Sequence, residues 1–187
     1  GGLSWITTAP ATAQMNIEIA GVGQSQLPVA IMRFAGETQL PMRPTDVIRS
    51  NIARSGALRN TEAGNGELAW DINPDYGSWN SRGAAALAVG SVTKMSDGRF
   101  EIRYRLFDIR KQESLGGLVI AAGPDDLRMA AHRISDDIIQ KLLGERGIFS
   151  TRLSYVIRAG NNYRLVISDS DGENPRPALA SKEPIIS

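Results

Sequence analysis

Cysteine is absent from this chain of 187 residues, and histidine occurs once. Without cysteine there are no disulfide bonds, no thiolate nucleophiles and no thiolate metal ligands. The single histidine, His132, has no glutamate at the spacing of a metal-binding helix, so we interpret it as a structural or surface residue and not as a catalytic base. We expect the chain to need neither a metal nor a cofactor.

An excess of charge and a long apolar run are also missing. The 21 basic and 20 acidic residues leave a net charge of +1, so no extended field attracts nucleic acid or an anionic membrane. No apolar run approaches the roughly 20 residues of a membrane-spanning helix. We therefore expect no nucleic-acid partner and no insertion into a membrane.

The motifs of common enzyme classes are missing as well. No serine stands in a G-x-S-x-G elbow, and no glycine-rich loop ends in Gly-Lys-Ser/Thr. Asp136 and Asp137 are neighbours on a predicted helix and point about 100° apart, so they cannot act as a facing acid/base pair. We expect one of them to be solvated and the other to be bonded. The chain is predicted not to be an enzyme, because no convergent set of reactive residues is visible.

The strongest pattern in the sequence lies in residues 125–157. Apolar residues recur there at steps of three and four, opposite charged residues such as Arg128, which predicts an amphipathic helix. The apolar positions are Leu127, Ala131, Ile134, Ile138 and Leu142. Asp125 or Asp126 is expected to cap the start of this helix, and Gly144 to end it.

The first half of the chain alternates between strand and helix patterns. Residues 27–34 are a continuous apolar run, which is typical of a strand buried on both faces. Residues 45–55 predict a helix capped by Thr45 or Asp46, and together with a short strand at residues 57–60 they indicate a β-α-β crossover. Three further strands are predicted at residues 85–92, 99–109 and 118–122. The predicted fold class is α/β, a mixed β-sheet packed by two main helices, over residues 24–147.

Residues 61–80 are rich in glycine, asparagine, aspartate and proline, which predicts an irregular surface loop. The loop carries Trp70, Tyr76 and Trp79. These aromatic residues either anchor a partner protein or, as we favour, cover the core, with the last two on a short helix. A small-molecule-binding or hydrolytic α/β domain that uses this loop is the alternative function.

The two ends of the chain have their own patterns. Residues 1–13 end in Ala11-Thr12-Ala13, the small-residue pattern of a signal-peptidase site, so they are either a signal-peptide remnant or a disordered tail. Residues 14–23 alternate briefly, as expected of a short strand that adds to a partner's sheet edge. Near the other end, residues 151–158 and 163–168 predict a β-hairpin.

The hairpin is followed by an acidic turn, residues 169–174. It contains part of a calcium-loop pattern, but it lacks the third acidic position and the distant glutamate, so a β-turn is expected instead. Residues 175–187 are expected to be poorly ordered.

Residues 132–174, HRISDDIIQKLLGERGIFSTRLSYVIRAGNNYRLVISDSDGEN, resemble the TolB family of the Tol-Pal system where its N-terminal α/β domain meets its β-propeller. The ISD, KL-G, G-F-TR, YV and S-D-x-DG-N elements match in order. The resemblance covers residues 14–187 and implies that residues 148–187 are the first strands of the propeller. Because TolB proteins continue for several more blades, we expect this chain to be a truncated fragment.

The resemblance implies a non-enzymatic periplasmic adaptor. Such a protein binds the C-terminal domain of TolA through its N-terminal segment and the lipoprotein Pal through its propeller, and it supports outer-membrane integrity and constriction during cell division. On this sequence, TolA recognition maps to residues 14–23, and the protein is expected to be a monomer. The candidate partner-binding residues are Gln14, Met15, Asn16, Ile17, Glu18, Ile19 and Val22. A third possibility is a purely structural domain that orients the propeller.

Overall fold

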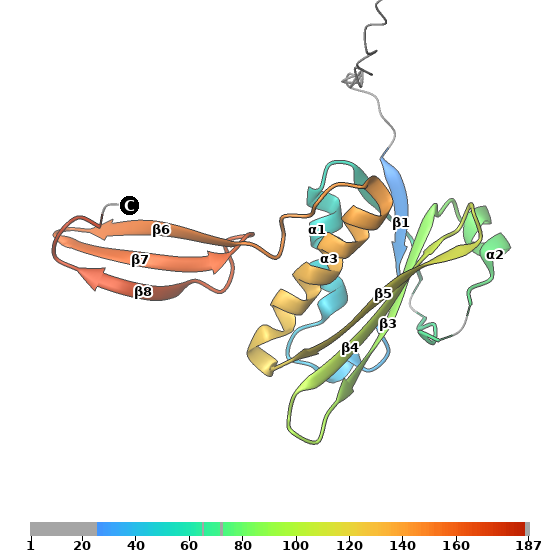
Figure 1. Ribbon diagram of the computed structural model, residues 1–187, viewed down its shortest axis with the longest axis horizontal. Helices are drawn as coiled ribbons and strands as arrows, with labels where there is room; N and C mark the ends of the chain where they lie inside the picture. The colour runs from blue at the N-terminus through green and yellow to red at the C-terminus, as the bar shows by residue number, and fades with distance from the viewer. Residues whose placement is uncertain (1–25, 65, 72, 186–187) are drawn as a thin grey trace, which may run out of the picture.

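The computed structural model of the chain describes residues 26–64, 66–71 and 73–185. It contains a five-stranded mixed sheet with helices and a separate three-stranded antiparallel sheet (Figure 1). The predicted α/β fold class is therefore confirmed. The candidate partner-binding residues, which lie in residues 14–22, fall outside the described residues. Within the described part, no helix is long and apolar enough to cross a membrane.

The five strands have the order β2-β1-β3-β4-β5. Strand β1 (Leu27–Ile31) pairs in parallel with both β2 (Leu58–Thr61) and β3 (Ala86–Lys94). Strands β3, β4 (Phe100–Asp108) and β5 (Glu113–Ala122) form an antiparallel meander. This arrangement is the β-α-β crossover followed by three strands that the hydrophobic pattern predicts.

Helices α1 (Pro44–Arg54) and α3 (Leu127–Leu143) lie side by side over one face of this sheet (Figure 1). Four of the five predicted apolar positions of α3 are at most 1% exposed. They are Leu127, Ala131, Ile134 and Ile138. Burying one leucine or isoleucine side chain contributes about 1.5–3 kcal/mol. The position of α3 is therefore set by packing more than by intrinsic helix propensity.

Both helices begin without the side-chain caps that the sequence predicts. Neither Asp125 nor Asp126 makes a cap bond, because a 3-10 turn, η2 (Pro124–Asp126), precedes α3. Helix α1 also lacks a side-chain cap of its own. Instead, the buried carboxylate of Glu37 accepts a hydrogen bond from the Thr45 N–H at 3.2 Å and another from the Thr45 hydroxyl. The predicted end of α3 is confirmed, since Gly144 adopts a left-handed conformation with φ of 74°.

The predicted loop of residues 61–80 covers the opposite face of the sheet. It includes α2 (Tyr76–Ser81), whose Trp79 is 7% exposed and belongs to the same apolar cluster as Phe107. The rings of Tyr76 and Phe107 meet edge to face with centroids 6.3 Å apart. The aromatic side chains therefore cover the core, which is the interpretation that the sequence favours.

The second sheet projects from the side of the helix layer (Figure 1). It consists of β6 (Arg152–Ala159), β7 (Asn162–Asp169) and β8 (Arg176–Ser181) in that order. The expectation that residues 175–187 are poorly ordered is wrong for β8, because the free edge of β7 offers backbone partners that residues 176–181 pair with. The predicted hairpin is thus extended by a third strand.

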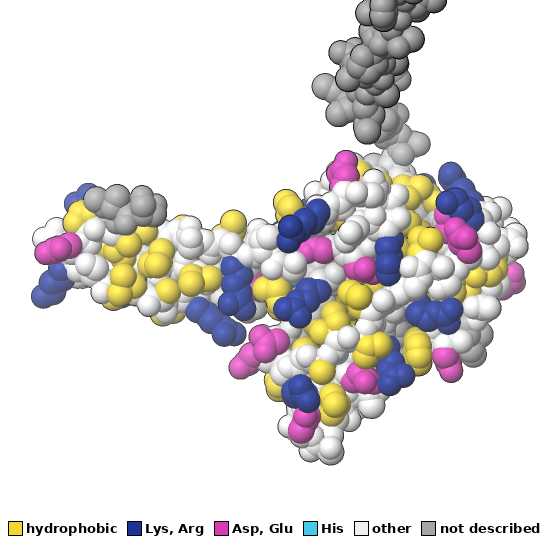
Figure 2. Space-filling model, in the orientation of Figure 1, with side chains coloured by type: hydrophobic (Ala, Val, Ile, Leu, Met, Phe, Trp, Pro, Cys, Tyr) yellow, Lys and Arg dark blue, Asp and Glu magenta, His cyan; other side chains and the backbone are white. Residues whose placement is uncertain are grey.

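Apolar side chains gather on the surface of this second sheet (Figure 2). Those exposed by 39% to 52% are Leu153, Tyr155, Val156, Ile157 and Leu179. Only one apolar side chain of the sheet, that of Val166, is buried among the described residues. The second sheet therefore has little core of its own.

Candidate functional site

A buried polar cluster lies where α1 and α3 meet the turn between β7 and β8. We call it the polar seam. Its members are Asn51 and Arg54 on α1, Arg128, His132 and Ser135 on α3, and Asp169 and Asp171 at the turn. Buried polar groups are costly unless they are paired, so such a cluster specifies how the elements around it are placed.

His132 connects all three elements of the polar seam. Its side chain is fully buried, and ring atom Nδ1 lies 2.9 Å from Nδ2 of Asn51 on α1. Ring atom Nε2 lies 3.8 Å from Oδ2 of Asp171 and 4.0 Å from Oδ2 of Asp169, and it makes no hydrogen bond. Of the two interpretations of His132, a structural or a surface residue, the burial of the ring supports the structural one.

The side-chain amide of Asn51 has a defined orientation. Its Oδ1 accepts a hydrogen bond from Nη2 of Arg54 at 2.6 Å. Its Nδ2 donates to Oγ of Ser135 at 2.9 Å, and the Ser135 hydroxyl donates in turn to the carbonyl of Ala131 at 2.9 Å. An arginine can only donate, so the oxygen of Asn51 must face Arg54 and its nitrogen must face α3.

This orientation determines which ring nitrogen of His132 carries the proton. Because Nδ2 of Asn51 is a donor, Nδ1 of His132 accepts, and the neutral ring carries its proton on Nε2, toward the two carboxylates. Burial lowers the pKa of His132, and the charges of Arg128 and Arg54 lower it further, while the two carboxylates act in the opposite direction. The ring is held in its neutral form.

Arg128 supplies one of the two positive charges that face the acidic turn. Its Nη2 donates to Oδ2 of Asp171, and its Nε lies 3.5 Å from Oδ2 of Asp169. Burial by itself raises the pKa of Asp171, but the Glu173 amide and the Arg128 guanidinium outweigh that effect and lower it. Arg128, which the helical pattern places on the polar face of α3, thus points to the second sheet and not to solvent.

Three atoms of the polar seam are close enough to raise the question of a metal ion. One ligand atom each from His132, Asp169 and Asp171 lies within 4.8 Å of the other two. A histidine that binds a metal through Nε2 carries its proton on Nδ1, where Asn51 here also donates. In addition, Arg128 pairs with both carboxylates and Nη2 of Arg54 lies 3.7 Å from Asp171, so two guanidinium groups already balance the two negative charges. These residues do not fit a metal site.

Asp136 and Asp137 bind elements on different sides of α3. The Asp136 carboxylate accepts the backbone N–H groups of Phe149 and Ser150 at 2.7 and 2.8 Å, which attaches the segment before β6 to the helix. The Asp137 carboxylate accepts the Tyr104 hydroxyl at 2.9 Å. The expectation that one of the pair is solvated is wrong, because both are half-buried and bonded.

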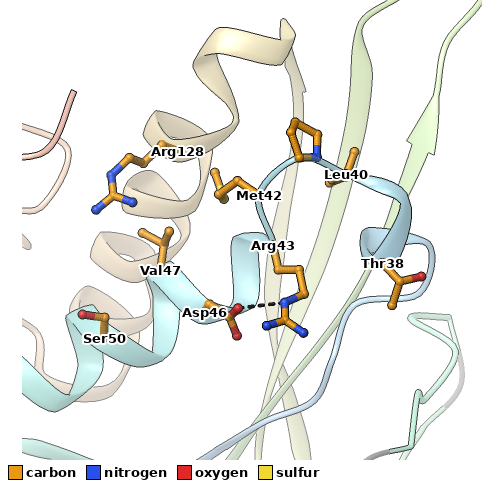
Figure 3. A pocket seen from close by; sticks show the side chains of 9 residues that line it. Thr38, Leu40, Met42, Arg43, Asp46, Val47, Ser50 and Arg128 are labelled. Carbon is orange, nitrogen blue, oxygen red and sulfur yellow. Dashed lines mark hydrogen bonds and ion pairs between the residues drawn. The ribbon is translucent and has the colours of Figure 1, made fainter.

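A pocket of about 560 Å³ opens beside the polar seam (Figure 3). The loop before α1, the first turns of α1 and Arg128 form it. Its lining residues are Thr38, Leu40, Pro41, Met42, Arg43, Asp46, Val47, Ser50 and Arg128. The Nε of Arg43 donates to Asp46 at 2.8 Å on the wall (Figure 3). The Asp46 carboxylate also lies 3.9 Å from Nη1 of Arg49, so the lining combines apolar side chains with ion pairs.

The aromatic loop provides no reactive cluster in its described residues. Asp75 caps α2 by accepting the Ser78 N–H at 3.2 Å. The guanidinium of Arg103 stacks on Trp70 at 5.0 Å from the ring centroid, and Arg105 donates to the Trp70 carbonyl at 3.3 Å. These groups stabilise the loop on the sheet, so the alternative function as a ligand-binding or hydrolytic domain gains no support here.

The sequence patterns do not show that the members of the polar seam lie together. Two polar residues on apolar helical faces nevertheless indicate buried hydrogen bonds. Asn51 lies between Ile48 and Ile52, and Ser135 lies beside Ile134. Polar residues on a buried stripe indicate an internal hydrogen bond. Which partners they meet is not readable from spacing, because Asn51 and His132 are 81 residues apart.

Comparison with known proteins gives one family. A model described as the TolB amino-terminal domain matches residues 15–115. The structure of TolB from Acinetobacter baumannii is similar at 31% identity and a TM-score of 0.71, covering 87% of this chain and 41% of that chain. This chain thus spans less than half the length of that protein.

Two other solved structures are similar at 15% identity and a TM-score of 0.38. The match to a PelC dodecamer from Paraburkholderia phytofirmans covers 73% of this chain and 94% of the PelC chain. The match to the lipoprotein GNA1162 from Neisseria meningitidis covers 62% of this chain and 98% of the lipoprotein chain. TM-scores of this size carry no argument about fold or function.

Proposed function

Because this chain belongs to the TolB family of the Tol-Pal system, we propose that it acts as a non-enzymatic periplasmic adaptor in that system. It binds the C-terminal domain of TolA through residues 14–23, and the propeller of the longer family members binds Pal. In this role it supports outer-membrane integrity and constriction during cell division. The observation that carries the proposal is the family match, which begins at residue 15 and so includes nearly all of the proposed TolA-binding segment.

The way the acidic residues are used supports a binding role over an enzymatic one. Asp136 holds backbone amides, Asp137 holds a tyrosine hydroxyl, and Asp75 caps a helix. The two carboxylates of the polar seam are balanced by Arg128 and Arg54. Groups that are committed to internal bonds are not available to move protons on a substrate.

The α/β domain binds the residues that follow the proposed binding segment in the sequence. The backbone N–H of Leu27 donates to the carbonyl of Ala57 at 3.0 Å, and the side chain of Gln26 donates to the carbonyl of Gly56 at 3.0 Å. The described chain therefore begins at Gln26, beside the edge strand β2. A short segment with an alternating pattern can add to the sheet edge of a partner.

The direct test is calorimetric titration of the C-terminal domain of TolA into this chain and into a version that begins at Gln24. Binding that is lost on truncation would support the proposal. Equal binding by both versions would move the site onto the α/β domain, and binding by neither would remove the support for TolA as a partner.

Point variants sharpen this test because alternate residues of a strand face opposite sides. Ile17→Asp places a charge on the apolar side of the segment and should weaken binding at least tenfold, about 1.4 kcal/mol. Ala20→Asp adds the same charge on the opposite side, at a position that is not among the candidate binding residues, and serves as the matched control, with an expected change below about threefold. Equal losses in the two variants would contradict pairing through one apolar side.

A further inference from the structure

We propose that protonation of His132 controls how firmly the second sheet is held to the helices. The neutral ring joins α1 to α3 and faces the β7–β8 turn. A second proton, on Nδ1, breaks the bond to Asn51 and loosens the second sheet. The inference concerns the internal structure of the chain and does not depend on which partner the chain binds. It rests on the hydrogen-bond directions around a single buried ring.

The first step is the conflict that a second proton creates. A protonated imidazole is a donor at both nitrogens. Its Nδ1–H would then face the amide nitrogen of Asn51, also a donor, at 2.9 Å. Turning the Asn51 amide over does not resolve the conflict, because its nitrogen would then face the guanidinium of Arg54, which now donates to the oxygen at 2.6 Å.

Ser135 makes the reversed amide less favourable still. Its hydroxyl accepts from Asn51 and donates to the carbonyl of Ala131, both at 2.9 Å. A reversed Asn51 would present an oxygen to Ser135, and the hydroxyl could donate to that oxygen only by leaving Ala131. With a protonated ring, either orientation of the Asn51 amide therefore leaves at least one buried hydrogen bond of the polar seam broken.

The second step is the balance of charge around the ring. Arg54 faces the ring from α1, Arg128 from α3, and Asp169 and Asp171 from the β7–β8 turn. Two positive and two negative groups are thus balanced while His132 is neutral. The carboxylates attract a protonated ring, but Arg128 already occupies them, and Nε2 lies at 3.8 and 4.0 Å, beyond hydrogen-bond distance.

The third step is what depends on this balance. Among the described residues, strands β6, β7 and β8 pack extensively only on one another. Their connection to the helices includes the polar seam, the Asp136 contacts to the segment before β6 and the packing of Phe149 in that segment against the core. Protonation would therefore loosen the turn from α1 and α3 while the Asp136 contacts keep the chain attached.

The experiment is a pH titration of the whole chain followed by NMR. His132 is the only histidine, so its ring C–H gives one assignable signal. We expect a ring pKa below 6.5 and amide signals of Asn51 and Asp171 that shift with the same midpoint. A ring that titrates at 6.5 or above would overturn the proposal, and so would amide signals that do not follow it.

A variant pair tests the role of Asn51 directly. Asn51→Asp gives Nδ1–H an acceptor and a negative charge, so the proton affinity of the ring should rise at least tenfold. Asn60→Asp adds the same charge on β2, where the Asn60 side chain donates to the Arg49 carbonyl and does not contact the ring, and should leave the ring titration nearly unchanged. Equal shifts in the two variants would overturn the proposal, and the titration of the unaltered chain decides the matter if Asn51→Asp does not fold.

Discussion

The two sheets of this chain differ in what covers them. The five-stranded sheet has helices on one face and the aromatic loop on the other, and its central strands β1, β3 and β4 contribute buried residues to the apolar clusters on both faces. In the three-stranded sheet, β6 is exposed along its whole length. Apolar burial therefore fixes the first sheet, whereas backbone pairing and a few polar contacts at one end fix the second. The two sheets should respond to different perturbations.

The largest effect is expected in the core of the first sheet. Ile134 is fully buried between α3 and the sheet, and replacing it with alanine removes apolar contacts and leaves a cavity. The free energy of unfolding should fall by about 2–5 kcal/mol. Val119→Ala is the control, since Val119 on β5 is 63% exposed, and it should change the stability by less than about 0.5 kcal/mol. Urea unfolding followed by circular dichroism measures both, and similar losses would contradict the role given to apolar burial.

A smaller and more local effect is expected where the second sheet is attached. Asp136→Ala leaves the half-buried N–H groups of Phe149 and Ser150 without their acceptor, at about 1 kcal/mol for each, the lower end of the cost for a fully buried group. Hydrogen exchange at these two amides should become at least roughly tenfold faster, while the amides of β3 and β4 keep their protection. The control is Asp125→Ala, which removes an exposed carboxylate that caps nothing. Faster exchange throughout the first sheet would contradict this local assignment.

The smallest effects are expected from pH, and they differ in sign between the two regions. Burial lowers the pKa of His132, so the unfolded chain binds more protons, and stability is lost as the pH falls from 6.5 through the lowered value. Burial raises the pKa of Glu37 despite its bonds to Thr45, so the folded chain binds more protons, and stability is lost as the pH rises from 4.5 through the raised value.

Two variants separate these opposing contributions. His132→Asn should remove the loss of stability on the acid side, and Glu37→Gln should remove the loss that accompanies rising pH. Each slope is at most about 1.4 kcal/mol per pH unit for one proton. Unfolding measured in steps between about pH 4.5 and 7 gives both slopes. A His132→Asn profile that parallels that of the unaltered chain would show that the seam histidine does not contribute.

The elements of the fold were predictable because their patterns are local. The three- and four-residue period of α3 and its end at Gly144 are properties of neighbouring residues, and the structure confirms them. The predicted position of α1 is confirmed to within a residue at each end, but its cap was not predictable, because the Thr45 N–H is bonded by Glu37 from the preceding turn. Strand β8 was missed as well, since its short run with Pro177 has no alternation and forms against the edge of β7.

The sequence by itself determined the types of the elements, the burial of the helical faces and the presence of polar residues on those faces, because periodicity and hydrophobicity act over a few residues. Only the tertiary structure decided that Asn51, His132 and Asp171 meet, which nitrogen of the ring carries its proton, and that Arg128 pairs with the acidic turn. These properties depend on groups from three elements approaching within hydrogen-bonding or ionic distance, and no local pattern encodes such a distance.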